Sequence, residues 1–131
     1  MITQTRGVHA YRQVQVQSRS PLELVVMLYD GALASLAQAS AAAAHGDTRQ
    51  RGAAISKTLS IVGTLQENLN LEEGGAIAAE LDRLYDYVKG RLLDVTLKRD
   101  PDGLAEIQAL LAGLRDAWHQ IATQPPQAAS S

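Results

Sequence analysis

Apolar residues recur at spacings of three and four along four segments of the chain, the pattern of amphipathic helices that pack in a bundle. The segments cover residues 20–45, 47–70, 76–99 and 100–124, and a turn at residues 71–75 precedes the third. The sequence contains almost no strand-like alternation. The stripes predict a core made of Leu22, Val25, Tyr29, Leu33, Leu36, Ile55, Leu59, Val62, Leu65, Leu69, Ile77, Leu81, Leu84, Val88, Leu92, Val95, Leu104, Ile107, Leu111, Leu114, Trp118 and Ile121.

Capping residues stand at the expected boundaries. Ser20 with Glu23 forms a capping box around a proline that suits the first helical position. Gly46 is suited to the left-handed conformation that ends a helix, and Asp47 caps the next one. Asp100 and the proline after it mark the start of the fourth helix. These signals place the end of one helix close to the start of the next, so we expect short connections.

Short connections between long helices require neighbouring helices to run antiparallel. We therefore predict an all-α fold, an antiparallel up-down-up-down four-helix bundle with a flexible N-terminal arm. The arm covers residues 1–19 and is partly ordered, the bundle covers 20–124, and 125–131 form a disordered tail after a Pro-Pro pair.

Charge and composition narrow the class of protein. The net charge is −2 and the pI is about 5.9, so no basic face for nucleic acid is implied. Cysteine is absent, which excludes thiol catalysis and cysteine metal sites. Residues 1–10 lack the apolar core of a signal peptide, and no run approaches the ~18 apolar residues of a membrane span. We expect a cytoplasmic protein without membrane insertion.

Candidate catalytic groups are few. His45 lies at a helix end, where a cation suits the helix dipole, and His119 follows the core residue Trp118. Asp116-x-x-His119 resembles half of a ferritin-like metal motif, but its partner carboxylates are missing. If the bundle were a histidine phosphotransfer protein, His119 would have to be the phosphoacceptor. The residues around His119 are not those usual for a phosphoacceptor histidine. We expect no enzyme, no metal and no cofactor.

Two charge-poor stretches favour binding of another protein. Residues 31–44 carry no charge and residues 53–66 carry only Lys57, whereas a solvated helix face is normally charged. At 100° per residue, Leu93 and Leu97 fall opposite the third helix's core stripe, beside Ala79 and Gly90. Such an apolar strip is typical of a protein contact. Burial by a curved helix end, by the N-terminal arm or by a homodimer is the alternative.

Four motifs carry a resemblance to a known family. They are residues 20–32 (SPLELVVMLYDGA), the Gly74-Gly75 turn, residues 84–87 (LYDY) and residues 115–118 (RDAW). In order and spacing they resemble the FliS family of flagellar secretion chaperones, and the similarity runs from about Val8 to Ile121.

The resemblance implies a type III export chaperone. Such a protein binds the disordered C-terminal segment of flagellin, prevents its premature polymerisation in the cytoplasm and delivers it to the flagellar export apparatus. No cofactor or nucleotide is implied. The alternative is a flagellar adaptor or regulator that binds an anti-sigma factor or a co-chaperone on the same bundle. The sequence leaves a monomer and a weak homodimer open.

The resemblance also places contacts for the flagellin segment. Val8 and Tyr11 match an apolar residue and a tyrosine of the family's arm, which implies that the arm covers the groove and moves when the client arrives. The alternative is a permanent latch formed by Tyr11 and Val14. With the arm and strip residues included, the expected flagellin contacts are Val8, Tyr11, Ile61, Leu65, Tyr85, Tyr87, Arg91, Leu93 and Leu97.

Two of these expectations are qualified by the sequence itself. Tyr85 and Tyr87 flank the core stripe on opposite sides, so one can pack between helices while the other faces the client. The family often has two arginines after the tyrosine motif, whereas this chain has Gly90-Arg91, and a common asparagine is replaced by Thr96. These departures affect individual polar contacts and leave the class unchanged.

Overall fold

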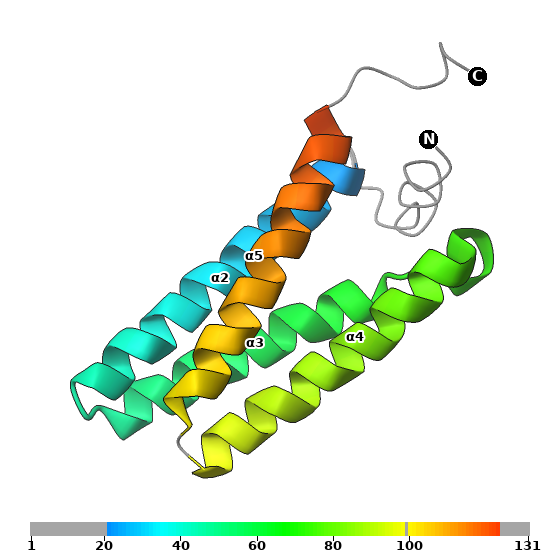
Figure 1. The fold of residues 1–131 in the computed structure, drawn as a ribbon. Coiled ribbons are helices and arrows are strands. Elements are labelled where there is room, and N and C mark those ends of the chain that lie inside the picture. Colours follow the sequence, from blue (N-terminus) through cyan, green and yellow to red (C-terminus); the bar gives the residue numbers. More distant parts are fainter. Residues whose placement is uncertain (1–20, 99, 124–131) are drawn as a thin grey trace.

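Four α-helices contain nearly all of the residues that the structure, a computed structural model, describes, namely 21–98 and 100–123 (Figure 1). They are α2 (Pro21–Ala44), α3 (Thr48–Glu67), α4 (Leu71–Lys98) and α5 (Pro101–Thr123). Within these two ranges there is no strand, and the predicted all-α fold is confirmed. The predicted arm, Ser20 and the C-terminal tail lie outside the described residues.

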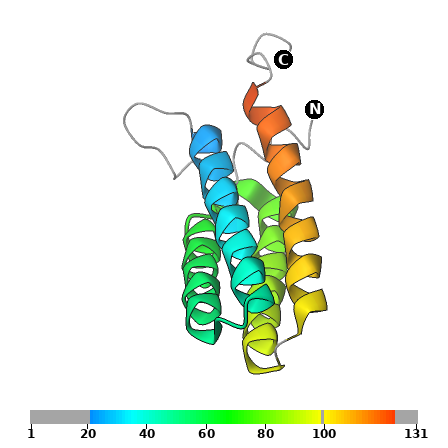
Figure 2. The same cartoon turned by 90° about the vertical axis from the view of Figure 1, so that its left-hand side faces the viewer.

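The helices form an antiparallel ring. Consecutive helices are joined by two or three residues, so each one runs back along its predecessor. Helix α2 packs on α3 and α5, and α4 packs on the same two helices from the other side. Figures 1 and 2 show the resulting up-down-up-down arrangement. Away from their connection, α4 and α5 diverge (Figure 1).

The predicted caps at two boundaries are present. Gly46 has φ 71°, and Asp47 N donates to Ala42 O at 2.8 Å, which closes the end of α2. The Asp47 carboxylate then accepts a hydrogen bond from Gln50 N at 3.0 Å and caps α3. At the start of α5, Asp100 accepts from Asp102 N at 3.0 Å.

The turn expected at residues 71–75 is wrong in its extent. Helix α4 already begins at Leu71, and the irregularity is concentrated at Gly75, with φ 57° and ψ −135°. The reason is a cap at Asn70, whose side-chain oxygen accepts from Glu73 N at 3.0 Å and whose carbonyl accepts from Gly74 N at 2.8 Å. These bonds form a helical turn before the break.

The core follows the predicted stripes and contains two polar pairs. Most of the predicted positions are buried, and Leu33, Leu59, Ile77, Leu84, Leu114 and Ile121 are partly buried against the core. The Tyr29 and Tyr85 hydroxyls lie 2.5 Å apart between α2 and α4. Ser35 and Thr58 hydroxyls, also 2.5 Å apart, join α2 to α3. Burial raises the pKa of Tyr29 well above its ordinary value, so this phenol keeps its proton.

Helix α2 is long and apolar enough, by length and composition, to cross a membrane, with a mean hydropathy of 1.3 in its most apolar window. It is also a core helix of the bundle, since Val25, Tyr29 and Leu36 are fully buried. A buried core helix passes the same test, so the finding is weak evidence for a membrane span.

Candidate partner-binding site

A polar cluster joins the C-terminal half of α4 to the start of α5. The Arg91 guanidinium lies 2.8 Å from Glu106 through Nε and 3.2 Å from Asp100 through a terminal nitrogen. The Tyr87 hydroxyl donates to the other Glu106 carboxylate oxygen. One carboxylate therefore accepts from two side chains one helical turn apart, which fixes α4 and α5 in register.

The hydrogen bonds shift the titration of this cluster. The bond from Tyr87, followed by that from Arg91, holds the pKa of Glu106 below its ordinary value. The same carboxylate raises the pKa of the Tyr87 phenol, chiefly by accepting its proton in a hydrogen bond. Glu106 also raises the pKa of Arg91, with Asp100 as the second cause. At neutral pH the cluster consists of two carboxylates, one guanidinium and one protonated phenol.

The position of the cluster shows which face of α4 is directed toward α5. Apolar residues continue along this face. Leu84 and Ile77 lie seven and fourteen residues before Arg91, on the same side of the helix. On α5, Leu110, Leu114 and Ile121 follow Glu106 at helical spacing. All five are only partly buried. They therefore form a row of core positions that the two helices leave incompletely covered.

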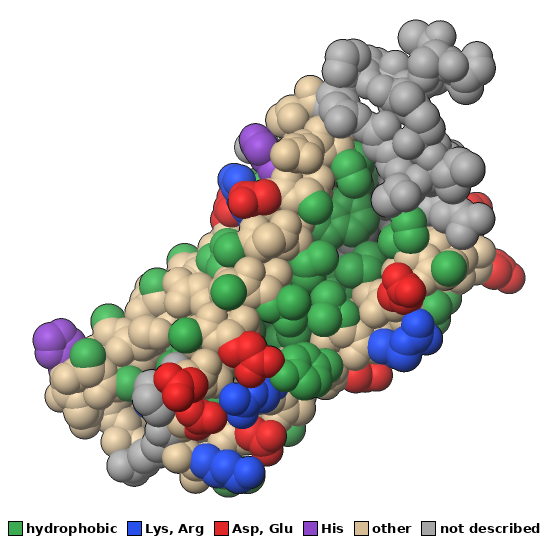
Figure 3. All heavy atoms as spheres, viewed as in Figure 1, with side chains coloured by type: hydrophobic (Ala, Val, Ile, Leu, Met, Phe, Trp, Pro, Cys, Tyr) green, Lys and Arg blue, Asp and Glu red, His purple; other side chains and the backbone are tan. Residues whose placement is uncertain are grey.

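We call this surface the α4–α5 seam, formed by Ile77, Leu84 and Tyr87 on α4 and by Leu110, Leu114 and Ile121 on α5. Figure 3 shows apolar side chains filling the band between these two helices, in the orientation of Figure 1. Charged side chains of both signs gather at its lower end in this view. Along this band the apolar residues Ile77, Leu84, Leu110, Leu114 and Ile121 are partly exposed.

A second apolar surface lies on α4 away from the core. Leu93 is 54% exposed and Leu97 is 81% exposed, and we call these two residues the outer strip. On the same flank, Gln66 Nε2 of α3 donates to Asp82 Oδ1 at 2.9 Å and to Asp86 Oδ1 at 2.8 Å. The outer strip therefore lies on the α3 side of α4, separate from the α4–α5 seam.

The other predicted contact residues are distributed unevenly. Tyr87 is 49% exposed, whereas Tyr85 and Leu65 are fully buried in the core. Contact of a partner with these two side chains requires the helices to separate. Ile61 is partly buried, and its Cδ1 would lie 3.4 Å from a Cβ placed on Gly31 of α2. Val8 and Tyr11 lie outside the described residues.

Of the seam residues, the sequence predicted Tyr87 as a contact and left Leu110 unassigned, whereas it placed the other four in the core. Ile77, Leu84, Leu114 and Ile121 occupy regular stripe positions, which look alike whether the next helix covers them fully or partly. The sequence did contain a signal: Ile77, Leu84 and Arg91 follow one another at intervals of seven residues and so lie on one side of the helix. A charged residue in such a series is unusual for a buried core stripe.

Among residues 21–98 and 100–123, no group of three or more His, Asp or Glu side chains is arranged to hold a metal ion. His119 is exposed on α5, and the carboxylate of Asp116 lies 3.5 Å from Arg115.

Fold and site together define an all-α, antiparallel four-helix bundle with a partly exposed apolar seam. The model of the family "Flagellar protein FliS" matches residues 4–125. The flagellar secretion chaperone FliS of Salmonella typhimurium is 40% identical over 120 residues, which cover 88% of this chain and 89% of that protein. The flagellar secretion chaperones FliSB of Pseudomonas aeruginosa and FliS of Vibrio cholerae are 36% and 35% identical, over 88% and 92% of this chain and 95% and 90% of theirs. The chain belongs to the FliS family.

Proposed function

We propose that this protein is a cytoplasmic flagellar secretion chaperone that binds the C-terminal segment of flagellin. It holds the segment apart from other flagellin molecules, which prevents premature polymerisation, and delivers it to the flagellar export apparatus. Membership of the FliS family supports the chaperone role, since relatives of this chain carry that name.

The observation that carries the proposal is the α4–α5 seam. A bundle that has no partner gains stability by covering its apolar core positions, at roughly 25 cal/mol per Å² of apolar surface. Here Ile77 and Leu84 on α4 and Leu114 on α5 remain partly uncovered. An amphipathic helix of a second chain would bury them by the helix-in-groove mode of recognition.

The outer strip supplies a second contact for the same client. Leu93 and Leu97 lie on the opposite flank of α4 from Leu84, so a segment that reaches both surfaces must pass around α4. Extended contact suits a client that is disordered when free, because ordering it costs several kcal/mol that a long apolar interface offsets. Chemistry at the site is unnecessary for this role.

A titration with a synthetic peptide of the flagellin C-terminal segment tests the proposal. Calorimetry is expected to give a one-to-one complex, and circular dichroism a gain of helix over the sum of the separate spectra. The variants Leu84→Asp and Leu97→Asp are expected to weaken binding about tenfold or more, because each buries a charge in an apolar contact.

Leu71→Asp is the matched control for these variants. Leu71 is 53% exposed, similar to Leu93, but it lies at the start of α4 outside both surfaces. It is expected to bind the peptide as the parent protein does. Absence of binding to the parent protein at micromolar concentration contradicts the proposal, and equal loss in the control would show that the apolar surfaces are not the contact.

A further inference from the structure

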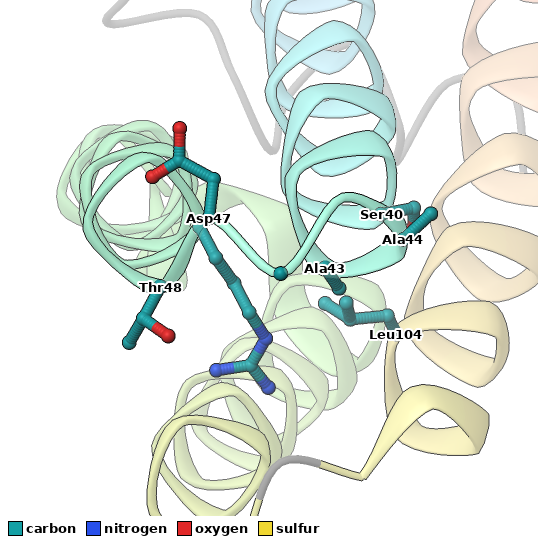
Figure 4. Close-up of a pocket in the computed structure, with 8 residues that line it drawn as sticks. Ser40, Ala43, Ala44, Asp47, Thr48 and Leu104 are labelled. Carbon is teal, nitrogen blue, oxygen red and sulfur yellow. The ribbon is translucent and has the colours of Figure 1, made fainter.

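A cavity of about 420 Å³ lies at the end of the bundle where the α2–α3 turn approaches the start of α5 (Figure 4). Its walls are the last turn of α2, the first residues of α3 and Leu104 of α5. Figure 4 shows Ala43 and Leu104 facing one another, with Asp47 and Thr48 on the α3 side. Its volume is within the range of pockets that hold small ligands or peptide ends.

Arg51 gives the cavity its chemistry. This residue lines the cavity and is only 7% exposed. Its Nη2 donates to the carbonyl of Val95 in the last turn of α4 at 2.7 Å. A guanidinium carries five N–H donors, and this bond accounts for one. Within the described ranges, no carboxylate lies within ion-pair distance of Arg51.

Arg51 lines the cavity, so its remaining donors can reach a ligand bound there. No fully buried side-chain nitrogen or oxygen of the described residues lacks a hydrogen-bond partner. The Arg51 nitrogens without a partner therefore keep contact with accessible space, and the cavity is the space that the residue lines. A buried cation normally has a counterion, and here the position for one is an accessible pocket.

We propose that this pocket binds a carboxylate of the client polypeptide, with Arg51 as the cation that receives it. The planar fork of a guanidinium matches the two oxygens of a carboxylate, and a hydrogen bond between two charged groups is stronger than one between neutral groups. Ser40 and Thr48 add hydroxyl groups to the walls, and Leu104 adds an apolar surface for the adjoining carbon atoms. Asp47 also lines the cavity, so the carboxylate must bind at the Arg51 end. The inference rests on the proposed function, because the client is the flagellin segment.

The source of the carboxylate is the terminal group of the client or an acidic side chain near its end. The test uses three synthetic peptides of the flagellin C-terminal segment: with a free terminal carboxylate, with a terminal amide, and with its last acidic side chain changed to the corresponding amide. The peptide that lacks the relevant carboxylate is expected to bind the parent protein about tenfold more weakly. Whichever of the two altered peptides binds more weakly identifies the source of the carboxylate.

Variants of the protein assign the effect to Arg51. In Arg51→Met the difference between the peptides is expected to disappear, because the cation that recognises the carboxylate is gone. Arg49→Met is the control, since it removes one positive charge from an exposed position on the same helix outside the cavity lining. Ala43→Glu supplies a carboxylate at the wall without removing the bond from Arg51 to Val95, and is expected to abolish the difference if Arg51→Met fails to fold.

The outcomes separate the two proposals. If no peptide binds the parent protein, the proposed function fails. If all three peptides bind the parent protein equally, the client is confirmed but the pocket does not receive a carboxylate. A peptide difference that persists unchanged in both Arg51→Met and Ala43→Glu also overturns the pocket proposal, because the recognising group then lies elsewhere.

Discussion

The Arg91 guanidinium of α4 and the Glu106 carboxylate of α5 lie 2.8 Å apart and fix these helices at one end. Tyr87 donates to the same carboxylate, so the contact has three members and a defined geometry. Beyond it, the two helices diverge and the α4–α5 seam begins (Figure 1). The polar contact therefore joins the two helices at one end, and the apolar seam lies at the end where they separate.

This contact predicts a pH dependence of stability. The pKa of Glu106 is lowered by its bond from Tyr87 and then by that from Arg91, so folding favours the ionised carboxylate. Its contribution is fully present above the unfolded-state value of about 4.3 and is lost as the pH falls through the folded-state pKa. Urea unfolding is expected to show Glu106→Gln as less stable than the parent at pH 7, with a smaller difference at pH 3.

The control for this prediction is Glu72→Gln. Glu72 is exposed in the first turn of α4 and forms no ion pair with a described residue. The Glu72→Gln substitution removes one negative charge, as Glu106→Gln does, but leaves the α4–α5 contact undisturbed. A stability difference for Glu106→Gln that grows as the pH falls would contradict the assignment.

Gly103 and Gly113, ten residues apart on α5, predict opposite effects of the same substitution. A Cβ on Gly103 would overlap Val95 Cγ2 and lie 3.2 Å from the Arg91 guanidinium carbon, whereas a Cβ on Gly113 meets nothing within 4 Å. Gly103→Ala is expected to destabilise the bundle by about 1–3 kcal/mol through overpacking. Gly113→Ala is expected to stabilise it by about 0.5–1 kcal/mol through helix propensity. Thermal unfolding of the two variants checks this, and equal shifts would contradict it.

The buried pair of Tyr29 and Tyr85 predicts coupled mutations. Removing either hydroxyl deprives the other of a partner at 2.5 Å in a site closed to water. Each single Tyr→Phe variant is expected to lose about 1–3 kcal/mol, and the double variant less than the sum of the two. Chemical denaturation of the four proteins measures the coupling. Additive losses would mean that the hydroxyls do not depend on one another.

Leucines on the two sides of α4 predict opposite consequences for stability. Leu92 is fully buried, whereas Leu97 is 81% exposed. Leu92→Ala is expected to cost about 2–5 kcal/mol, because it leaves a cavity in the core. Leu97→Ala is expected to change the free energy of unfolding by no more than about 0.5 kcal/mol. A large loss for Leu97→Ala would assign this residue to a structural contact and remove it from the outer strip.

Local signals in the sequence predicted the helices because they act within one helical turn. Asp47 and Asp100 cap α3 and α5 as expected, and Gly46 ends α2 in the left-handed conformation. The turn at residues 71–75 was placed wrongly because Asn70 was assigned to the end of the preceding helix. In the sequence, such a residue is compatible both with the end of one helix and with the cap of the next, so the pattern alone does not assign it.

The candidate site was predictable only in part. The exposed outer strip of Leu93 and Leu97 followed from the angle around a single helix, which requires no knowledge of its neighbours. The separation of two helices does not follow from either one, so Leu84 and Leu114 were expected in the core. The sequence placed Leu65 both in the core and among the contacts, and it left open which of Tyr85 and Tyr87 packs inside. The full burial of Leu65 and Tyr85 depends on how closely the facing helices approach.

The sequence by itself determined the helical periodicity, the caps at Asp47 and Asp100 and the apolar stripes, since all three depend on residues close together in the chain. Only the tertiary structure decided which stripe positions are covered, and that Arg51 reaches the carbonyl of Val95, 44 residues away. Coverage and long-range hydrogen bonds depend on distances between helices, and packing of the whole bundle sets these distances.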